Sequence, residues 1–372
     1  MSNLSIYVHI PFCNSKCNYC NFVSGKFDDK TIDLYFKKLI KEIKSKADVF
    51  KNKEVVSIYF GGGTPSSVGV EYIQSIVQCI NNNYNISENC EISIEVNPCS
   101  ATKEKFEFYK SIGINRISIG VQSLSNRSLK IIGRRHTADE AMHAIKLAKD
   151  SGIDNISCDF LIGIPYQSKI ELIDGVDKVI GLGVKHISAY MLILEQNTLL
   201  NTMVDNGEIE VASEDVSINL YEELLCFLRN KGYHRYEISN FCEKGYECLH
   251  NERYWSLDDY VGFGLSAHSY YNGVRYANTC NMTDYLNESY CIQEEMLTQE
   301  QKYEEYIMLS LRTIKGIDIE YLKNEFNFDI LKLKFNEIEF LKINGFVKIN
   351  DRCISLTDRG FEVCNQIILK LI

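Results

Sequence analysis

The sequence lacks any apolar run that could cross a membrane. A spanning helix needs about 20 consecutive apolar residues, and no stretch of the 372 residues is that long. The first twelve residues also lack the basic region and apolar segment of a secretory leader. Cysteines such as Cys79 and Cys158 lie within apolar runs, where a thiol behaves as a small hydrophobic side chain. We therefore expect a soluble, reduced, cytoplasmic protein.

Basic residues are in deficit, and repeats are absent. Lys and Arg number 40 against 50 Asp and Glu, which gives a formal net charge of −10. A general nucleic-acid-binding surface needs a basic stripe to meet the phosphates, so no nucleic-acid partner is expected. No internal repeat or low-complexity segment is present either. With 45% hydrophobic residues the chain can form a sizeable core, and we expect one large and one smaller domain.

Three cysteines are concentrated in one short segment. Cys13, Cys17 and Cys20 follow an apolar run with the spacing Cys-x3-Cys-x2-Cys. One loop can therefore direct three thiolates at a single centre, and thiolates suit iron–sulfur clusters or zinc. Zinc is the weaker choice, because a structural zinc site usually takes four ligands in two pairs and no second Cys-x2-Cys pair exists. On a four-iron cluster, three ligands leave one iron open to a small molecule.

The first half of the chain alternates strands with helices. Apolar runs predict strands near residues 6–10, 55–60, 91–96, 116–121, 155–162 and 185–191, with periodic helical segments between them, the first over residues 28–50. Such alternation implies a parallel sheet. Because parallel sheets hold ligands at the carboxyl ends of their strands, chemistry is expected directly after each strand.

Glycines and charged side chains occupy those strand ends. Gly61-Gly62-Gly63 lets the backbone approach a ligand closely, for example a methionine amino group, and a tight turn is the alternative. Glu95 and Asp159 lie on otherwise apolar strands, where an unpaired carboxylate is costly to bury; solvation at the strand end is the alternative. Arg134 is expected either to pair with a carboxylate or to cap a surface helix.

Beyond residue 193 the alternation breaks, and helices and loops are expected to about residue 243. Residues 248–255, CLHNERYW, bring the only tryptophan together with tyrosine, histidine and cysteine. Aromatic rings beside a histidine suit a flat macrocycle with a metal to ligate; an aromatic core cluster with a hydrogen-bonded histidine is the alternative. Residues 299–372 predict helices, a two-stranded wing and a last helix. For this unit we favour packing over DNA binding, because acidic residues accompany its lysines.

Together the motifs resemble the coproporphyrinogen III oxidase branch of the radical S-adenosylmethionine (SAM) superfamily, and within it the haem chaperones. The matches run through nearly the whole chain in the family's order, among them IYVHIPFC, CNYCNF, YFGGGTPS, IEVNP, RISIGVQS, DFLIGIP, YEISNF, HNERYW and VGFGLSAHS. The resemblance implies an α/β fold with a partial (β/α)6 radical SAM barrel over residues 1–193, an α+β extension over 194–298, and a winged-helix-like domain over 299–372.

The resemblance also implies the cofactors and their contacts. It makes Cys13, Cys17 and Cys20 the ligands of a [4Fe–4S] cluster, and it implies bound SAM and haem. For SAM it implies contacts from Tyr7, Gly62, Gly63, Thr64, Glu95, Gln122, Arg134 and Asp159. For haem it implies the HNxxYW signature, which is His250, Asn251, Tyr254 and Trp255 in this sequence, with His250 as the candidate iron ligand.

Two departures distinguish the chain from the oxidases of that branch. Phe22 stands where they have a fourth cysteine, and their N-terminal extension is missing ahead of the first strand. We therefore expect a haem chaperone without coproporphyrinogen III oxidase activity. Its expected partners are haem and acceptor haemoproteins, membrane-bound respiratory enzymes among them, and a homodimer is left open. The alternatives are an oxygen-independent coproporphyrinogen III oxidase, a HemN-like radical SAM methyltransferase that holds two SAM molecules, and a winged-helix regulator with a redox-sensing cluster.

Overall fold

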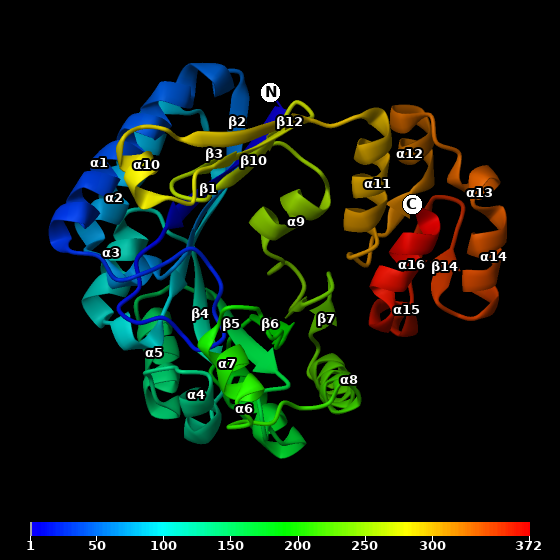
Figure 1. The fold of residues 1–372 in the computed structure, drawn as a ribbon, viewed down its shortest axis with the longest axis horizontal. Helices are drawn as coiled ribbons and strands as arrows, with labels where there is room; N and C mark the ends of the chain where they lie inside the picture. The colour runs from blue at the N-terminus through cyan, green and yellow to red at the C-terminus, as the bar shows by residue number, and fades with distance from the viewer. Residues whose placement is uncertain (1) are drawn as a thin grey trace.

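The computed structural model describes residues 2–372 and is organised around one open twelve-stranded sheet (Figure 1). Six parallel strands form its centre in chain order, as the alternation of apolar runs predicted. They are β1 (Ser2–Ile10), β2 (Lys53–Gly62), β3 (Ile86–Val96), β4 (Arg116–Gln122), β5 (Asn155–Ile162) and β6 (His186–Met191). The sheet curves but does not close, so the predicted partial barrel is confirmed.

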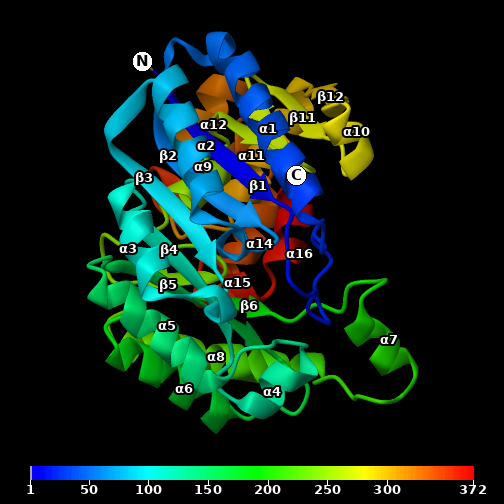
Figure 2. The same cartoon turned by 90° about the vertical axis from the view of Figure 1, so that its left-hand side faces the viewer.

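Helices cover the outer face of this sheet, as Figure 1 and Figure 2 show. They are α1 (Asp29–Lys46), α2 (Val70–Asn83), α3 (Lys103–Ser111), α4 (Asn126–Ile131), α5 (Ala138–Asp150) and α6 (Lys169–Gly181). Side-chain caps fix several of their starts; Thr137, for example, forms a capping box with Glu140 at the start of α5. The helix expected over residues 28–50 is shorter than predicted, because α1 ends at Lys46 and a 3₁₀ turn, Ala47–Phe50, completes the segment.

The sheet continues on both sides of the parallel strands. After α7 (Leu199–Asp205) and α8 (Glu214–Asn230) comes a hairpin of β7 (His234–Arg235) and β8 (Asn240–Cys242), in which β8 pairs antiparallel with β6 and β7 forms the edge of the sheet. This hairpin corrects the prediction of helices and loops alone for that segment; strands of two and three residues carry no periodic signal. On the other side, β9 (Tyr260–Phe263) pairs with β1 in parallel, followed by β10 (His268–Tyr271), β11 (Val274–Asn278), α10 (Met282–Leu286) and β12 (Cys291–Met296). Helix α9 (Leu249–Trp255) precedes β9.

The C-terminal segment has its own hydrophobic core, which runs from Tyr306 to Leu371. The predicted wing is present as β14 (Val347–Ile349) and β15 (Cys353–Leu356), and β13 (Ile317–Asp318) adds a third strand. The helices are α11 (Gln299–Ser310), α12 (Ile319–Phe326), α13 (Ile330–Leu333), α14 (Phe335–Ile343), α15 (Asp358–Glu362) and α16 (Cys364–Leu371). The boundaries near residues 193 and 298 stay predictions.

One arginine joins this unit to the main sheet. Arg235 on β7 is nearly buried and pairs with Asp358 at 2.6 Å, and its guanidinium stacks 3.8 Å from the Phe361 ring centroid.

None of the helices in residues 2–372 combines the length and the apolar character that a membrane span requires.

Candidate functional site

The three-cysteine loop lies at the carboxyl end of the parallel strands. Main-chain hydrogen bonds close its base, with the Cys13 amide donating to Gly25 and the Gly25 amide to Pro11, both at 2.9 Å. Asn18 ties the middle of the loop to the end of α4, since its amide and side chain donate to the carbonyls of Ile132 and Ile131 at 3.0 and 2.9 Å. These hydrogen bonds give the loop a defined shape at the ends of the strands.

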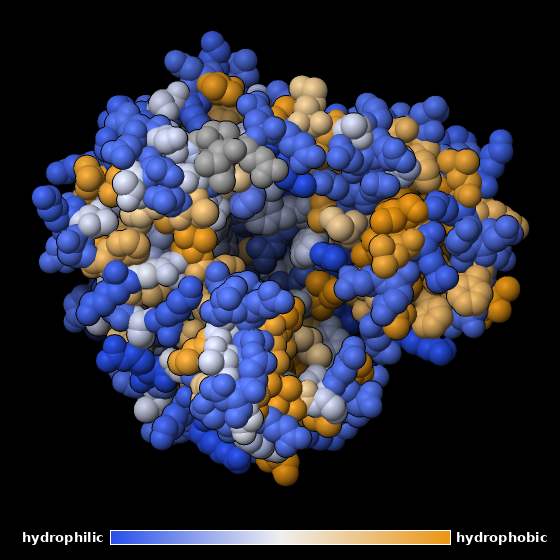
Figure 3. Space-filling view, viewed as in Figure 1, coloured by the Kyte–Doolittle hydropathy of each residue, from blue (hydrophilic) through white to orange (hydrophobic). Residues whose placement is uncertain are grey.

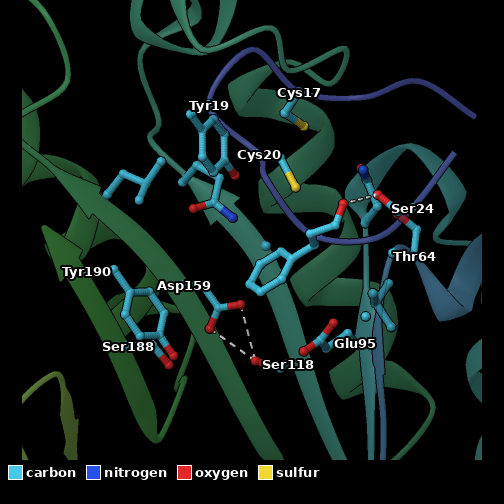
Figure 4. Close-up of a pocket in the computed structure, with 18 of the residues that line it drawn as sticks. Cys17, Tyr19, Cys20, Ser24, Thr64, Glu95, Ser118, Asp159, Ser188 and Tyr190 are labelled. Atoms are coloured by element: carbon cyan, nitrogen blue, oxygen red, sulfur yellow. Dashed lines mark hydrogen bonds between the residues drawn. The ribbon is translucent and has the colours of Figure 1, made fainter. Parts of the chain in front are cut away.

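All three thiols of this loop are free, partly exposed and face one cavity. Figure 4 shows Cys17 and Cys20 above the carboxylates of Glu95 and Asp159. Burial raises the pKa of the Cys20 thiol, and the neighbouring Cys17 and Cys13 raise it further. Three soft donors gathered on one loop fit a [4Fe–4S] cluster and leave one iron without a protein ligand; when bound, such a cluster supplies an electron to its ligand.

The cavity below the cysteines has a volume of about 460 Å³, which falls in the range of small-molecule sites. Glu95 on β3 accepts a hydrogen bond from the Tyr59 hydroxyl at 3.1 Å, and Asp159 on β5 accepts one from the Ser118 hydroxyl at 3.0 Å. Burial and the nearby Asp159 raise the pKa of Glu95 to about 7. Burial raises the pKa of Asp159 as well, although hydrogen bonds from Ser188 and Ser118 oppose the shift. A cationic group bound here would favour the ionised form of both carboxyls.

Arg134 lies in the wall of the same cavity, on the cysteine side. Its Nη2 donates to the Gly120 carbonyl at 2.6 Å and its Nη1 to Cys17 Sγ at 3.5 Å. The Nε is buried without a partner, and no carboxylate in residues 2–372 forms an ion pair with this guanidinium. Neither the carboxylate pair nor the surface cap expected from the sequence is present. A guanidinium on one side and two carboxylates on the other fit the zwitterionic amino-acid end of SAM.

The glycine turn after β2 has a steric reason that the sequence did not reveal. Gly62 has φ +111°, and a Cβ there would lie 2.6 Å from the His9 ring. A Cβ on Gly63 would lie 2.9 Å from the carbonyl oxygens of Ile10 and Phe12, and the Gly63 amide donates to Ile10 at 2.8 Å. Both glycines line the cavity. The direct reason for glycine at these positions is that a side chain would prevent the turn from packing against β1 and the start of the cysteine loop.

The structure brings seven of the eight expected SAM contacts to the 460 Å³ cavity. They are Gly62, Gly63, Thr64, Glu95, Gln122, Arg134 and Asp159. Tyr7 does not line it. The Tyr7 hydroxyl lies 3.0 Å from His9 Nδ1, and its ring faces a second cavity.

The HNxxYW segment forms α9, which packs inside the curved sheet against β2. His250 is 1% exposed and stacks on Tyr59, with 5.1 Å between ring centroids. Its Nδ1 lies 2.9 Å from Ser57 Oγ and its Nε2 lies 2.9 Å from the Tyr254 hydroxyl. Burial lowers the pKa of His250 to about 3, so the imidazole is neutral. In this arrangement both ring nitrogens are engaged, as in the aromatic core cluster that was the alternative interpretation.

The other members of the motif point in different directions. Asn251 lines the first cavity, whereas Tyr254 lines the second. The Trp255 indole nitrogen is buried without a partner among the described residues. The motif therefore lies between two cavities instead of surrounding one.

The second cavity has a volume of about 590 Å³ and was not predicted from the sequence. Its walls come from β1, the cysteine loop, α9, the β9–β11 strands and α11: Tyr7, His9, Asn21, Phe22, Val23, Tyr254, Leu257, Tyr260, Ser266, His268, Tyr270, Arg275 and Leu309. Asn21 and Phe22 also line the first cavity, so the cysteine loop separates the two. Figure 3 shows that this face of the molecule is hollowed at its centre, beside the C-terminal unit.

An open parallel barrel that carries a three-cysteine loop at its strand ends defines a radical SAM protein. The Radical SAM superfamily model matches residues 7–179, and the HemN C-terminal domain model matches residues 297–363. The relative named heme chaperone HemW from Lactococcus lactis is 34% identical over 99% of this chain and 97% of its own length. HemW from Bacillus subtilis is 30% identical over 98% of this chain and 97% of its own length. The chain therefore belongs to the HemW family, as the motifs indicated.

A solved structure supports the fold assignment. The radical SAM enzyme coproporphyrinogen III oxidase (HemN) from Escherichia coli matches with a TM-score of 0.86, over 100% of this chain and 90% of that one. The sequence identity is 20%, so this likeness establishes the shared fold alone.

Proposed function

We propose that this protein is a cytoplasmic haem chaperone, which binds haem beside a SAM-ligated [4Fe–4S] cluster and delivers the haem to acceptor haemoproteins, membrane-bound respiratory enzymes among them. The observation that carries the proposal is the second cavity, because it adjoins the cysteine loop and receives Tyr254 from the HNxxYW segment. The full-length similarity to relatives named heme chaperones supports the same function.

The chemistry of the second cavity suits a flat, largely apolar macrocycle. Its volume of about 590 Å³ lies within the range of cofactor sites, and its walls carry the rings of Phe22, Tyr254, Tyr260 and Tyr270. Such rings offer large apolar faces on which a porphyrin can stack. Arg275 adds a cationic group, which pairs at 2.6 Å with Glu305 and is placed to exchange this partner for a propionate.

Of the histidines that line this cavity, His268 is the one whose ring nitrogens have no hydrogen-bond partner among the described residues. Its side chain is exposed. His9, by contrast, lies 3.0 Å from both the Tyr7 hydroxyl and the Val23 carbonyl. His250 must release Ser57 or Tyr254 before a ring nitrogen is free. We propose His268 as the first candidate for the axial ligand and His250 as the alternative, with His250 otherwise supporting the wall formed by Tyr254.

Oxidation of coproporphyrinogen III is not expected. Phe22 occupies the position of the oxidase's fourth cysteine, is 63% exposed and lines both cavities. This aromatic ring supplies an apolar contact between the two cavities, whereas a thiol would supply a nucleophile or a ligand.

A haem titration of the anaerobically reconstituted protein, followed by absorption, tests the proposal. The parent should bind haem in stoichiometric amount and transfer it to an apo-haemoprotein. His268→Ala should shift the Soret band or weaken binding while its iron content and melting temperature stay at parent values, because the side chain is exposed. His143→Ala, an exposed histidine on α5, is the matched control and should bind as the parent does.

Three results would contradict parts of this proposal. If the parent did not bind haem in stoichiometric amount, the proposed chaperone function would be wrong. A parent-like spectrum in His268→Ala, together with a changed spectrum in His250→Ala, would move the ligand to His250. Catalytic conversion of coproporphyrinogen III by the parent would replace the chaperone with the oxidase.

A further inference from the structure

Three metal-ligating side chains meet outside both cavities. His234 and Cys242 are directly opposite one another on β7 and β8, with 3.9 Å between His234 Nε2 and Cys242 Sγ. Glu247 reaches them from the turn that follows β8, and its Oε1 lies 2.9 Å from His234 Nε2. One ligand atom from each residue lies within 4.8 Å of the others.

The position of each donor is set by the backbone. Residues opposite one another on neighbouring strands direct their side chains to the same face of a sheet, which places the imidazole beside the thiol. The second carboxylate oxygen of Glu247 accepts a hydrogen bond from the Gly245 amide at 2.9 Å, so Oε1 is left toward His234. Cys242 is fully buried, whereas the His234 and Glu247 side chains are 38% and 25% exposed, so an ion can enter from the imidazole and carboxylate side.

We propose that His234, Cys242 and Glu247 form a zinc-binding site in which water supplies the fourth ligand. Nitrogen, sulfur and oxygen donors of this kind bind zinc at about 2.0–2.3 Å, which separates neighbouring ligand atoms of a tetrahedral site by about 3.3–3.8 Å. His234 Nε2 lies 2.9 Å from Glu247 Oε1 and 3.9 Å from Cys242 Sγ, one distance below that range and one above it. Small rotations of the side chains would bring both distances into the range.

The charges of the donors also fit a divalent cation. A thiolate and a carboxylate together balance the two positive charges of zinc, and the imidazole binds in its neutral form. The Cys242 side chain binds a metal as a thiolate, so its thiol must give up a proton when the ion enters. Zinc binding therefore displaces one proton from Sγ to solvent.

The proposed metal would stabilise the floor of the first cavity. Glu247 directly precedes Cys248, whose amide donates to the Tyr236 hydroxyl at 3.2 Å, and that hydroxyl lies 2.8 Å from His186 Nε2. Cys248 and His186 both line the first cavity, and helix α9 begins immediately after Cys248. A metal between β7, β8 and Glu247 would therefore fix the start of the HNxxYW helix. This site does not depend on haem binding.

The test must separate this site from the cluster cysteines, because thiolates are zinc ligands as well. We would measure zinc retained after dialysis in the cluster-loaded parent and in the full chain with Cys13, Cys17 and Cys20 all changed to Ala. Both should retain about one zinc per chain. Cobalt in the triple variant should give the charge-transfer band of a thiolate ligand together with the visible bands of tetrahedral cobalt.

Single changes at the proposed ligands should abolish or weaken this binding in the triple-variant background. Cys242→Ser should lose the thiolate band, and Glu247→Gln should weaken zinc binding at least tenfold while the metal-free chain keeps the circular dichroism of the triple variant. Cys226→Ser, which removes an exposed thiol on α8, is the matched control and should bind zinc as before. The proposal would be overturned if the triple variant retained no more zinc than its Cys242→Ser derivative. Cobalt binding without a thiolate band would overturn it as well.

Discussion

Replacing Glu95 with glutamine removes a carboxyl group that titrates abnormally in the folded chain. Its pKa rises from an ordinary 4.5 to about 7, because it is buried and faces Asp159. Between these two values the unfolded chain has lost the proton while the folded chain keeps it. The unfolded state therefore binds fewer protons, and the free energy of unfolding falls as the pH rises through this window.

The size of the effect follows from the two pKa values. A difference of about 2.5 corresponds to about 3.4 kcal/mol once the pH exceeds both values. With a folded pKa of about 7, roughly 2 kcal/mol is already lost at pH 6, so about 1.3 kcal/mol remains to be lost between pH 6 and pH 8. Glu95 should therefore lower the free energy of unfolding of the parent by about 1.3 kcal/mol between pH 6 and pH 8. Glu95→Gln should lack this contribution to the pH dependence.

Urea unfolding of the cluster-free chain at pH 6 and pH 8 measures the difference. Glu107→Gln, an exposed glutamate on α3, is the matched control and should keep the pH dependence of the parent. Ligand binding gives a second measurement: the SAM ammonium favours an ionised Glu95, so SAM affinity of the cluster-loaded parent should rise from pH 6 to pH 8. An unchanged pH dependence of unfolding in Glu95→Gln would refute the reasoning.

The remaining predictions concern the glycine turn, the buried histidine and the cluster ligands. Gly62→Ala should destabilise the chain by about 3 kcal/mol, because φ is +111° and the new Cβ would meet the His9 ring; a parent-like melting temperature would contradict this. His250→Ala should lower the free energy of unfolding by about 2–4 kcal/mol through a cavity and two lost hydrogen bonds, and unchanged denaturation would show that these contacts contribute little. The parent should retain about four irons and four sulfides per chain after reconstitution, and alanine at any of Cys13, Cys17 or Cys20 should reduce both numbers. Full cluster content in these variants would show that the loop does not ligate the cluster.

Local patterns determined much of this protein. Apolar runs that alternate with periodic segments predicted the six parallel strands, because strand and helix periodicity depends on neighbours in the chain. The same pattern predicted where chemistry would collect: Glu95 and Asp159, on different strands, reach one cavity because parallel strands end at the same edge of a sheet. The spacing of Cys13, Cys17 and Cys20 predicted one shared centre, since a short loop keeps its own residues close together.

Only the tertiary structure decided which distant segments meet. The second cavity joins Tyr7 to Tyr254 and His268 because β9 pairs with β1, a contact between residues about 250 positions apart that no local signal encodes. His250 has its Nδ1 engaged because Ser57 on β2 lies opposite it, and Gly62 must be a glycine because the ring of His9 occupies the space of a Cβ. The same holds for Arg134, whose surroundings depend on how α4 packs against the cysteine loop. Packing between segments that are remote in sequence therefore set the environment of each side chain, while the sequence alone determined its chemistry.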